Sequence, residues 1–112
     1  MKLVNRRNAA VLAESVERAT TVFARLRGLL GRDSLSGALV IEPCTSIHTF
    51  FMKFAIDAAF LTAEGRVIRA ISAIRPWRAT RIYLSAAKVV ELPAGTLERT
   101  RTTEGDVLAF EL

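Results

Sequence analysis

The sequence predicts a mainly β domain of the α+β class: a compact β-sandwich or barrel-like fold of about seven short strands, with one short helix near residues 20–30. Turn-forming residues recur along the chain and leave mostly short segments between them, a spacing typical of strands. Apolar residues make up 51% of the 112 residues and aromatic residues only 7%, so aliphatic side chains fill most of the core. This length suits a single domain covering residues 1–112.

The first half of the chain is expected to contain strands on both sides of the helix. A brief strand at Leu3–Val4 leads into a longer one at Ala9–Val16. Thr20 or Thr21 can cap the helix, because a hydroxyl accepts a hydrogen bond from an unpaired amide. The helix would bury one apolar stripe and end at a glycine that tolerates a left-handed backbone; these residues are Phe23, Leu26, Leu30 and Gly31.

The second half is expected to contain the remaining strands. Ala38–Ile41 is a candidate buried strand, and Phe60–Thr62 and Val67–Ile74 flank a tight turn that predicts a hairpin. Ile82–Leu92 alternates apolar residues along one face and predicts a long strand that ends at Pro93. After it we expect a helical turn at Thr96–Arg99 and a last strand at Val107–Leu112, with inward side chains at Leu108, Phe110 and Leu112.

The chain is basic, with a net charge of +5, but its arginines are scattered along the sequence. A scattered distribution is weak evidence for nucleic acid, which we therefore rank below other partners. The local exception runs from Arg75 to Arg81 and includes the single tryptophan; its candidate patch residues are Arg75, Trp77, Arg78 and Arg81. The patch is either an ordinary solvated turn or a site for an anion or partner.

Compartment and cofactor predictions follow from what the chain contains. Cys44 is the only cysteine, so no internal disulfide can form, which suits a reducing compartment. The first residues show no signal-peptide pattern, and no stretch approaches the roughly 20 apolar residues of a membrane span. We therefore expect a basic cytoplasmic protein without a membrane span, and no cofactor.

The best site candidate is the apolar run Ser46–Leu61, into which a histidine, a methionine and an aspartate are set. Such a run should be buried, and a buried ionisable group needs a partner or a purpose. If the run is extended, His48, Phe50 and Met52 share one face, and Thr49, Phe51 and Asp57 share the other. Arg32 is the expected partner of Asp57, because a guanidinium can bind both carboxylate oxygens. The candidate ligand-binding residues are Arg32, His48, Thr49, Phe51, Met52 and Asp57.

Each of these residues also has a structural interpretation. His48 can satisfy its ring nitrogens on the backbone, Met52 can fill the core between rings, and Asp57 with Arg32 can form a purely structural ion pair. A catalytic Cys44–His48 pair would need a turn, because the two residues lie roughly 13 Å apart on a strand. No spacing supplies three or four strong metal ligands, so no metal site is expected.

An ordered set of short motifs supports a family resemblance. Gly28-Leu-Leu-Gly-Arg32, Ile47-His-Thr-Phe-Phe-Met52, Pro76-Trp77-Arg78 and Glu91-Leu-Pro-Ala-Gly95 follow one another along the chain. This set resembles domain-of-unknown-function family 192, small bacterial and archaeal proteins. The resemblance implies a compact, mainly β domain with one helix after the first strands, and no established activity, substrate or cofactor. It covers the chain from about Arg18 onward. Many relatives begin with a secretion signal, a pattern that the first residues of this sequence do not show.

The residues favour a small binding module. Its pocket would lie around His48, Met52 and Asp57 and take a small molecule or a segment of a protein partner, because polar groups that converge on an aromatic run are typical of ligand pockets. One alternative is a hydrolase with His48 as candidate catalytic general base. Another is weak binding of nucleic acid or an anion by the Arg75–Arg81 patch. We expect a monomer.

Overall fold

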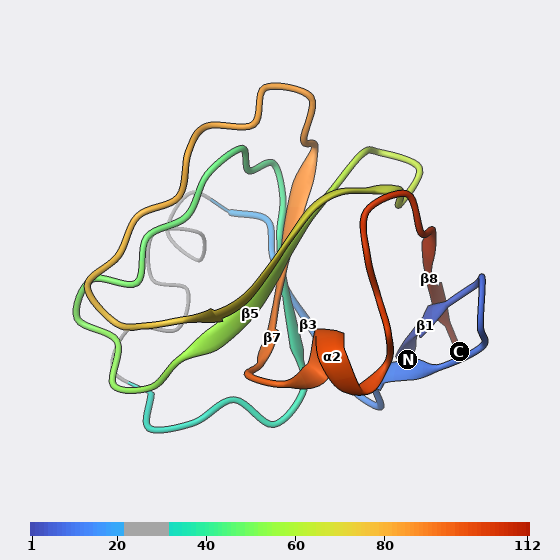
Figure 1. Cartoon of the computed structure of the whole chain (residues 1–112), viewed down its shortest axis with the longest axis horizontal. Helices are drawn as coiled ribbons and strands as arrows, with labels where there is room; N and C mark the ends of the chain where they lie inside the picture. The colour runs from blue at the N-terminus through green and yellow to red at the C-terminus, as the bar shows by residue number, and fades with distance from the viewer. Residues whose placement is uncertain (22–31) are drawn as a thin grey trace.

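The structure is a computed structural model that describes residues 1–21 and 32–112 (Figure 1). These residues form eight strands and one short helix. The elements are β1 (Lys2–Asn5), β2 (Val11–Ala13), β3 (Val16–Ala19), β4 (Ala38–Ile41), β5 (Ile56–Leu61), β6 (Val67–Ile74), β7 (Lys88–Pro93), α2 (Thr96–Arg99) and β8 (Leu108–Glu111). The prediction of a mainly β domain is thus confirmed.

Two sheets divide these strands. One has the order β2-β1-β8, and the other has the order β3-β4-β7-β5-β6. Only β3 and β4 pair in parallel within the part of the chain described, and the other pairs are antiparallel. The described strands do not close into a barrel. Of the two predicted architectures, a β-sandwich and a barrel-like fold, the sandwich of two sheets is therefore found.

A first apolar cluster lies between the two sheets. The small sheet contributes Leu3, Leu12 and Leu108, and α2 contributes Leu97. The large sheet contributes the side chains of Val40, Ala59, Leu61, Val67, Val90 and Leu92. Burying this apolar surface is what holds the small sheet against one face of the large one.

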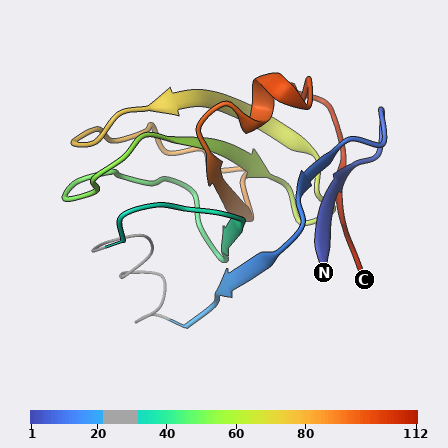
Figure 2. The ribbon, with the colours of Figure 1, turned by 90° about the horizontal axis from the view of Figure 1, so that it is seen from below.

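A second apolar cluster lies on the other face of the large sheet. Strand β5 is buried along its whole length, and its alternate residues Ile56, Ala58 and Phe60 belong to this second cluster. The cover includes side chains from the connections between strands: Ile47, Met52, Tyr83 and Ala86. The two long connections, residues 42–55 between β4 and β5 and residues 75–87 between β6 and β7, therefore form a layer over the sheet. We call them the paired loops. They project at the end of the molecule away from both termini (Figures 1 and 2).

Several predicted boundaries are wrong for reasons of pairing. The predicted strand Ala9–Val16 is divided, because β2 pairs with β1 in the small sheet and β3 pairs with β4 in the large one. The predicted strand Ile82–Leu92 is a strand only from Lys88, because the amide of Tyr83 bonds the Thr45 carbonyl of the other paired loop instead of a strand. Leu112 is fully exposed instead of inward-facing.

Other predictions are confirmed. Strand β4 has the bounds predicted for it, and so does the helical turn Thr96–Arg99. The hairpin is present as β5 and β6, although β5 begins at Ile56, earlier than predicted. The predicted helix near residues 20–30, with its stripe Phe23, Leu26 and Leu30, falls almost wholly outside the described residues.

Candidate binding surface

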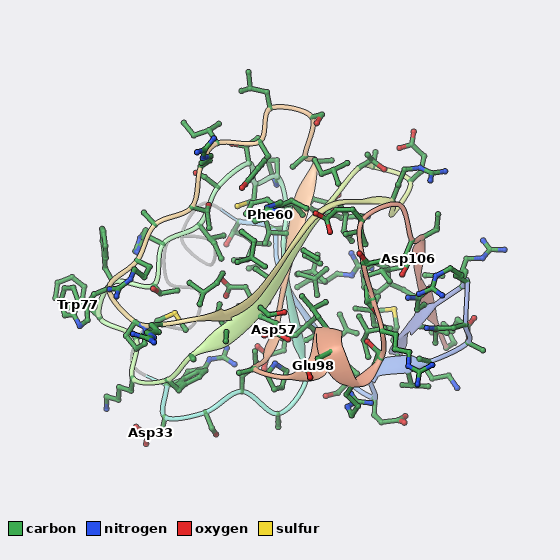
Figure 3. All side chains as sticks on the ribbon, in the orientation of Figure 1. Asp33, Asp57, Phe60, Trp77, Glu98 and Asp106 are labelled. Carbon is green, nitrogen blue, oxygen red and sulfur yellow. The ribbon has the colours of Figure 1, made fainter. Side chains whose placement is uncertain are left out.

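Asp57 is fully buried on β5 and bonds to the main chain. One carboxylate oxygen accepts the amide of Ala73 at 2.8 Å, and the other accepts the amide of Leu97 at 2.9 Å. The first bond braces a bulge in β6, where the register shifts opposite Asp57, and the second fixes the start of α2 (Figure 3). The carboxylate is therefore committed to joining β5, β6 and α2.

The predicted ion pair between Arg32 and Asp57 is not found. Its guanidinium binds Glu17 at 2.8 Å, an ion pair that solvent reaches on both sides. The positive charge of Arg32 also acts on a buried acid, Glu91 on β7. Burial raises the pKa of Glu91 to about 7, against a smaller lowering effect from Arg32. The pairing was wrong because β5 turns Asp57 toward α2.

His48 and Met52 separate from each other. His48 is exposed; its Nδ1 accepts the amide of Phe50 at 3.2 Å, and its ring stacks on the Phe50 ring with centroids 5.0 Å apart. Met52 is buried in the second apolar cluster, as its interpretation as core filler expects. The predicted extended face of His48, Phe50 and Met52 is wrong, because a turn at Phe50–Phe51 redirects the chain.

Thr49 joins the two paired loops. It is fully buried, and its hydroxyl donates to the Arg75 carbonyl at 2.6 Å and accepts the amide of Arg78 at 2.9 Å. Its main chain bonds the loop of Trp77 and Arg78 as well, at 2.9 and 2.8 Å. Residues 45 and 47 continue the pairing toward Tyr83 and Thr80. Thr49 thus holds the two paired loops together.

The pairing brings together two features that the sequence keeps apart. Phe51 from the apolar run and Trp77 from the arginine patch pack against each other, with ring centroids 4.6 Å apart. Phe50 adds a third ring, 6.1 Å from Trp77. All three rings are exposed: Phe50 to 39%, Phe51 to 68% and Trp77 to 55%. The expectation that the whole run Ser46–Leu61 is buried is therefore wrong at its turn.

Phe51 and Trp77 also hold an unfavourable backbone. Their φ angles are 65° and 66°, in the left-handed region that a bulky side chain rarely adopts. This conformation costs about 1 kcal/mol or more at each residue, and such strain concentrates at functional sites. Here it presents two large rings to solvent, which lowers stability without filling the core.

After Glu42 at the start of the first loop, the charge on the paired loops has one sign. The sequence contains no Asp or Glu from Pro43 to Ile56, nor from Arg75 to Val90. Arg75, Arg78 and Arg81 are all exposed there. Lys53, also exposed, bonds Asp33 at 3.1 Å. We call the exposed side chains His48, Phe50, Phe51, Arg75, Trp77, Arg78 and Arg81 the loop surface.

Three exposed apolar residues of the paired loops were not predicted to lie at the surface. Phe50 was placed on a buried face, and Ile82 and Leu84 were assigned to a strand, but they are exposed to 66% and 87%. The signal that could have found them is the absence of acidic residues from residues 43–56 and 75–90, since an ordinary solvated segment carries carboxylates.

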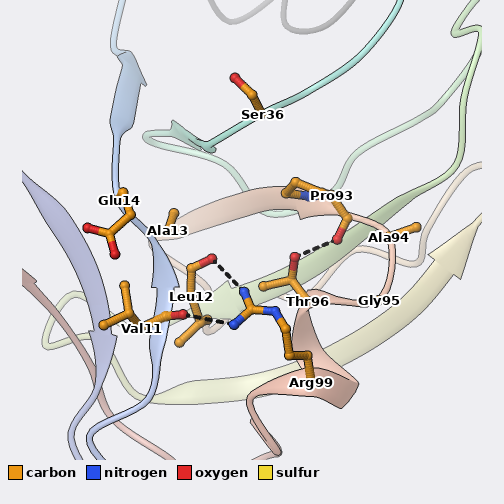
Figure 4. A pocket seen from close by; sticks show the side chains of 10 residues that line it. All are labelled: Val11, Leu12, Ala13, Glu14, Ser36, Pro93, Ala94, Gly95, Thr96 and Arg99. Carbon is orange, nitrogen blue, oxygen red and sulfur yellow. Dashed lines mark hydrogen bonds between the residues drawn. The ribbon is translucent and has the colours of Figure 1, made fainter.

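Two concavities formed by described residues lie elsewhere. One, of about 480 Å³, lies between β2 and α2 (Figure 4). Its polar side chains already have partners: Arg99 donates to the carbonyls of Val11 and Leu12, and Thr96 donates to that of Pro93. The other lies beside Arg7 and Asp106. Neither includes a residue of the predicted site.

The side chains of the loop surface are aromatic rings, guanidinium groups and one imidazole. Within residues 1–21 and 32–112, no three His, Cys, Asp or Glu side chains gather closely enough to hold a metal ion. The thiol of Cys44 donates to the carbonyl of Ser46 at 3.0 Å. Exposed rings and guanidinium groups can stack, cover apolar groups and attract anions. No helix in the described part of the chain has the length and apolarity to cross a membrane.

Comparison with known proteins agrees with this fold. A UPF0127 protein of Thermococcus sibiricus is 33% identical, over 98% of this chain and 75% of its own length. A UPF0127 protein of Thermococcus gammatolerans is 32% identical over the same shares. The crystal structure of a protein of unknown function from Novosphingobium aromaticivorans superposes with a TM-score of 0.82 at 17% identity, covering 97% of this chain and 82% of that one.

The family model described as "Uncharacterized ACR, COG1430" matches residues 3–110, nearly the whole chain. The resemblance that the short motifs indicated is therefore confirmed, and this protein belongs to family DUF192.

Proposed function

We propose that this protein is a binding domain and that the loop surface is its binding site. The observation that supports this proposal is the strained exposure of Phe51 and Trp77, whose side chains would be better placed in the core if they served stability alone. The proposal keeps the binding module that the sequence favours but moves its centre. Asp57 and Met52 belong to the scaffold, and the contacts to a partner come from the rings and arginines.

The alternative of a hydrolase has less support. A general base is usually oriented by a second group, often a carboxylate. Residues 43–55 and 75–87 contain no acid, and Nδ1 of His48 accepts the Phe50 amide. His48 is better explained as part of the ring cluster. The lone Cys44 suits a reducing compartment, so the proposal keeps the cytoplasm as the location and a monomer as the free state.

The test compares three classes of partner with one panel of variants. The full chain is titrated with single-stranded oligonucleotides and with lipid vesicles, and its own self-association is measured by sedimentation. Phe51→Ser with Trp77→Ser removes both strained rings, and Leu112→Ser removes an exposed apolar residue at the far end as a control. We expect one class to bind the wild type and the control but not the double variant.

Stability separates binding from folding in the same experiment. Because Phe51 and Trp77 are exposed and strained, the double variant should unfold within about 1 kcal/mol of the wild type. A loss of several kcal/mol would assign the rings to the scaffold and contradict the proposal. So would equal binding of every class by the wild type and the double variant.

A further inference from the structure

We infer that the loop surface docks on the surface of an anionic lipid bilayer. This inference rests on the proposed function and names its partner. It depends on four observations: where the exposed apolar side chains lie, which charges accompany them, how the rings pack on one another, and where the paired loops lie in the molecule.

The exposed large apolar side chains are concentrated in the paired loops. Seven such residues are exposed in the described part of the chain, and two of them, Met1 and Leu112, are its first and last residues. The other five all lie in the paired loops: Phe50, Phe51, Trp77, Ile82 and Leu84. Exposed apolar side chains gathered in one part of a molecule mark a protein or membrane contact, and Trp and Phe are side chains that favour the bilayer interface.

The charges fit an anionic lipid headgroup. Arg75, Arg78 and Arg81 alternate with the apolar residues along one loop, and residues 43–55 and 75–87 contain no carboxylate that would be repelled by lipid phosphate. Cations near an anionic leaflet each strengthen binding, and their effect falls off within a Debye length. Arginines beside a partly inserted ring can therefore reach headgroups while the ring reaches the acyl boundary.

The packing of the rings favours lipid over single-stranded nucleic acid. Base stacking needs free ring faces. Here neighbouring rings already occupy part of each other's surface: Phe51 contacts Trp77 at 4.6 Å with the ring planes tilted by 59°, and His48 stacks on Phe50 at 5.0 Å. Ile82 and Leu84 have no ring to offer a base. A fluid apolar boundary accepts ring edges and aliphatic side chains alike, so it uses all five apolar residues.

The position of the surface is also suitable. Trp77 lies at an extremity of the molecule, far from Asp106 at the other end (Figure 3). The paired loops project away from both termini and from α2 (Figures 1 and 2). A bilayer could therefore meet the loops without contacting the small sheet.

The experiment uses the full chain and vesicles of phosphatidylglycerol and phosphatidylcholine, with pure phosphatidylcholine vesicles as the neutral comparison. Trp77 is the only tryptophan, so its fluorescence reports on the loop surface alone. We expect its emission to shift to shorter wavelength and to become shielded from an aqueous quencher on anionic vesicles only. Co-sedimentation should give the same partition as the fluorescence.

Charge-matched variants make the test specific. Arg75→Gln, Arg78→Gln and Arg81→Gln together should weaken the partition by at least about tenfold. The control removes the same charge at the other end of the chain's fold with Arg6→Gln, Arg66→Gln and Arg69→Gln, and should weaken it only slightly. The double variant Ile82→Ser with Leu84→Ser keeps Trp77, and its fluorescence should also show a weaker partition onto anionic vesicles. Circular dichroism verifies that each variant is folded.

The outcomes separate this inference from the proposed function. If anionic vesicles leave the Trp77 emission unchanged but an oligonucleotide or self-association changes it, the lipid partner is wrong and the proposal of a binding domain is retained. Equal losses in the two arginine triples would mean diffuse charge attraction and would overturn the lipid site. If none of the three partners changes the Trp77 emission, both proposals are wrong.

Discussion

At the scale of the residue, two side chains of the apolar run have roles opposite to those that their chemistry suggests. Asp57 is an ionisable group set into an apolar run, which suggested a ligand site, yet both its oxygens accept main-chain amides. Phe51 is an aromatic residue in the same run, which suggested the core, yet it is exposed to 68%. The burial expected from an apolar run therefore did not distinguish the scaffold residue from the surface residue.

The role of Asp57 predicts the effect of its amide analogue. Asparagine retains one oxygen, so Asp57→Asn leaves either Ala73 or Leu97 with an unpaired buried amide facing an NH₂ group. We expect a loss of about 2 kcal/mol in the free energy of unfolding, measured by urea denaturation. Asp33→Asn is the control, since that carboxylate is exposed. Wild-type stability in Asp57→Asn would show that these bonds do not support the fold.

Glu91 predicts a dependence of stability on pH. Its ordinary pKa is 4.5 and burial raises the value to about 7, so between these pH values the folded chain binds more protons than the unfolded chain. Stability from this group therefore falls as pH rises through that window, by up to about 3 kcal/mol. Glu91→Gln should remove this fall, measured as the difference in unfolding free energy between variant and wild type from pH 4 to 8. Parallel pH profiles would contradict the prediction.

Asp106 behaves in the opposite direction and in a lower pH range. Hydrogen bonds from Arg7, first among several donors, hold the pKa of this carboxyl well below its usual value. Its contribution is present above the ordinary pKa of about 4 and is lost as pH falls below it. The two groups therefore act in separate windows and do not mask each other.

At the scale of the element, the crossing between the two sheets determines the strand boundaries. After β2 the chain leaves the small sheet, and β3 joins the large one beside β4. The crossing is tight, because the amide of Ala38 bonds the Ser15 carbonyl at 3.0 Å. No local pattern in Ala9–Val16 indicates that neighbouring residues pair with different sheets.

Gly37 is required at this crossing. A side-chain carbon there would lie 2.6 Å from the Ser15 carbonyl oxygen, closer than real contacts allow. Gly37→Ala should therefore shift β3 against β4 and cost about 1–3 kcal/mol in thermal or urea unfolding. The neighbouring Ser36→Ala, at an exposed position, should have almost no effect. Equal stability in both variants would show that the crossing relaxes freely.

At the scale of the whole molecule, the two apolar clusters share the strands of one sheet. Strands β5 and β7 contribute alternate residues to both clusters, so neither cluster can open without disturbing the other. The paired loops cover the second cluster through Ile47 and Met52 and are thereby part of the cooperative structure. The aromatic rings are carried on a supported layer rather than on a free loop.

This arrangement predicts a single unfolding transition. Trp77 reports on the loop layer, whereas far-ultraviolet circular dichroism reports on both sheets. We expect the two signals to give the same midpoint and slope in urea, because the clusters unfold together. A Trp77 transition at lower urea than the circular dichroism transition would show that the paired loops open independently.

The sequence by itself determined the fold class, the family, the strand at Ala38–Ile41, the hairpin and the turn at Thr96–Arg99, because periodicity, turn residues and short motifs are local signals. It also singled out the apolar run and the arginine patch. Only the tertiary structure decided that Thr49 joins these two segments, that Asp57 faces α2 instead of Arg32, and that Phe51 and Trp77 meet at the surface. The reason is physical: these contacts link residues more than 20 positions apart, and a local pattern specifies which face a side chain takes but not what it meets there.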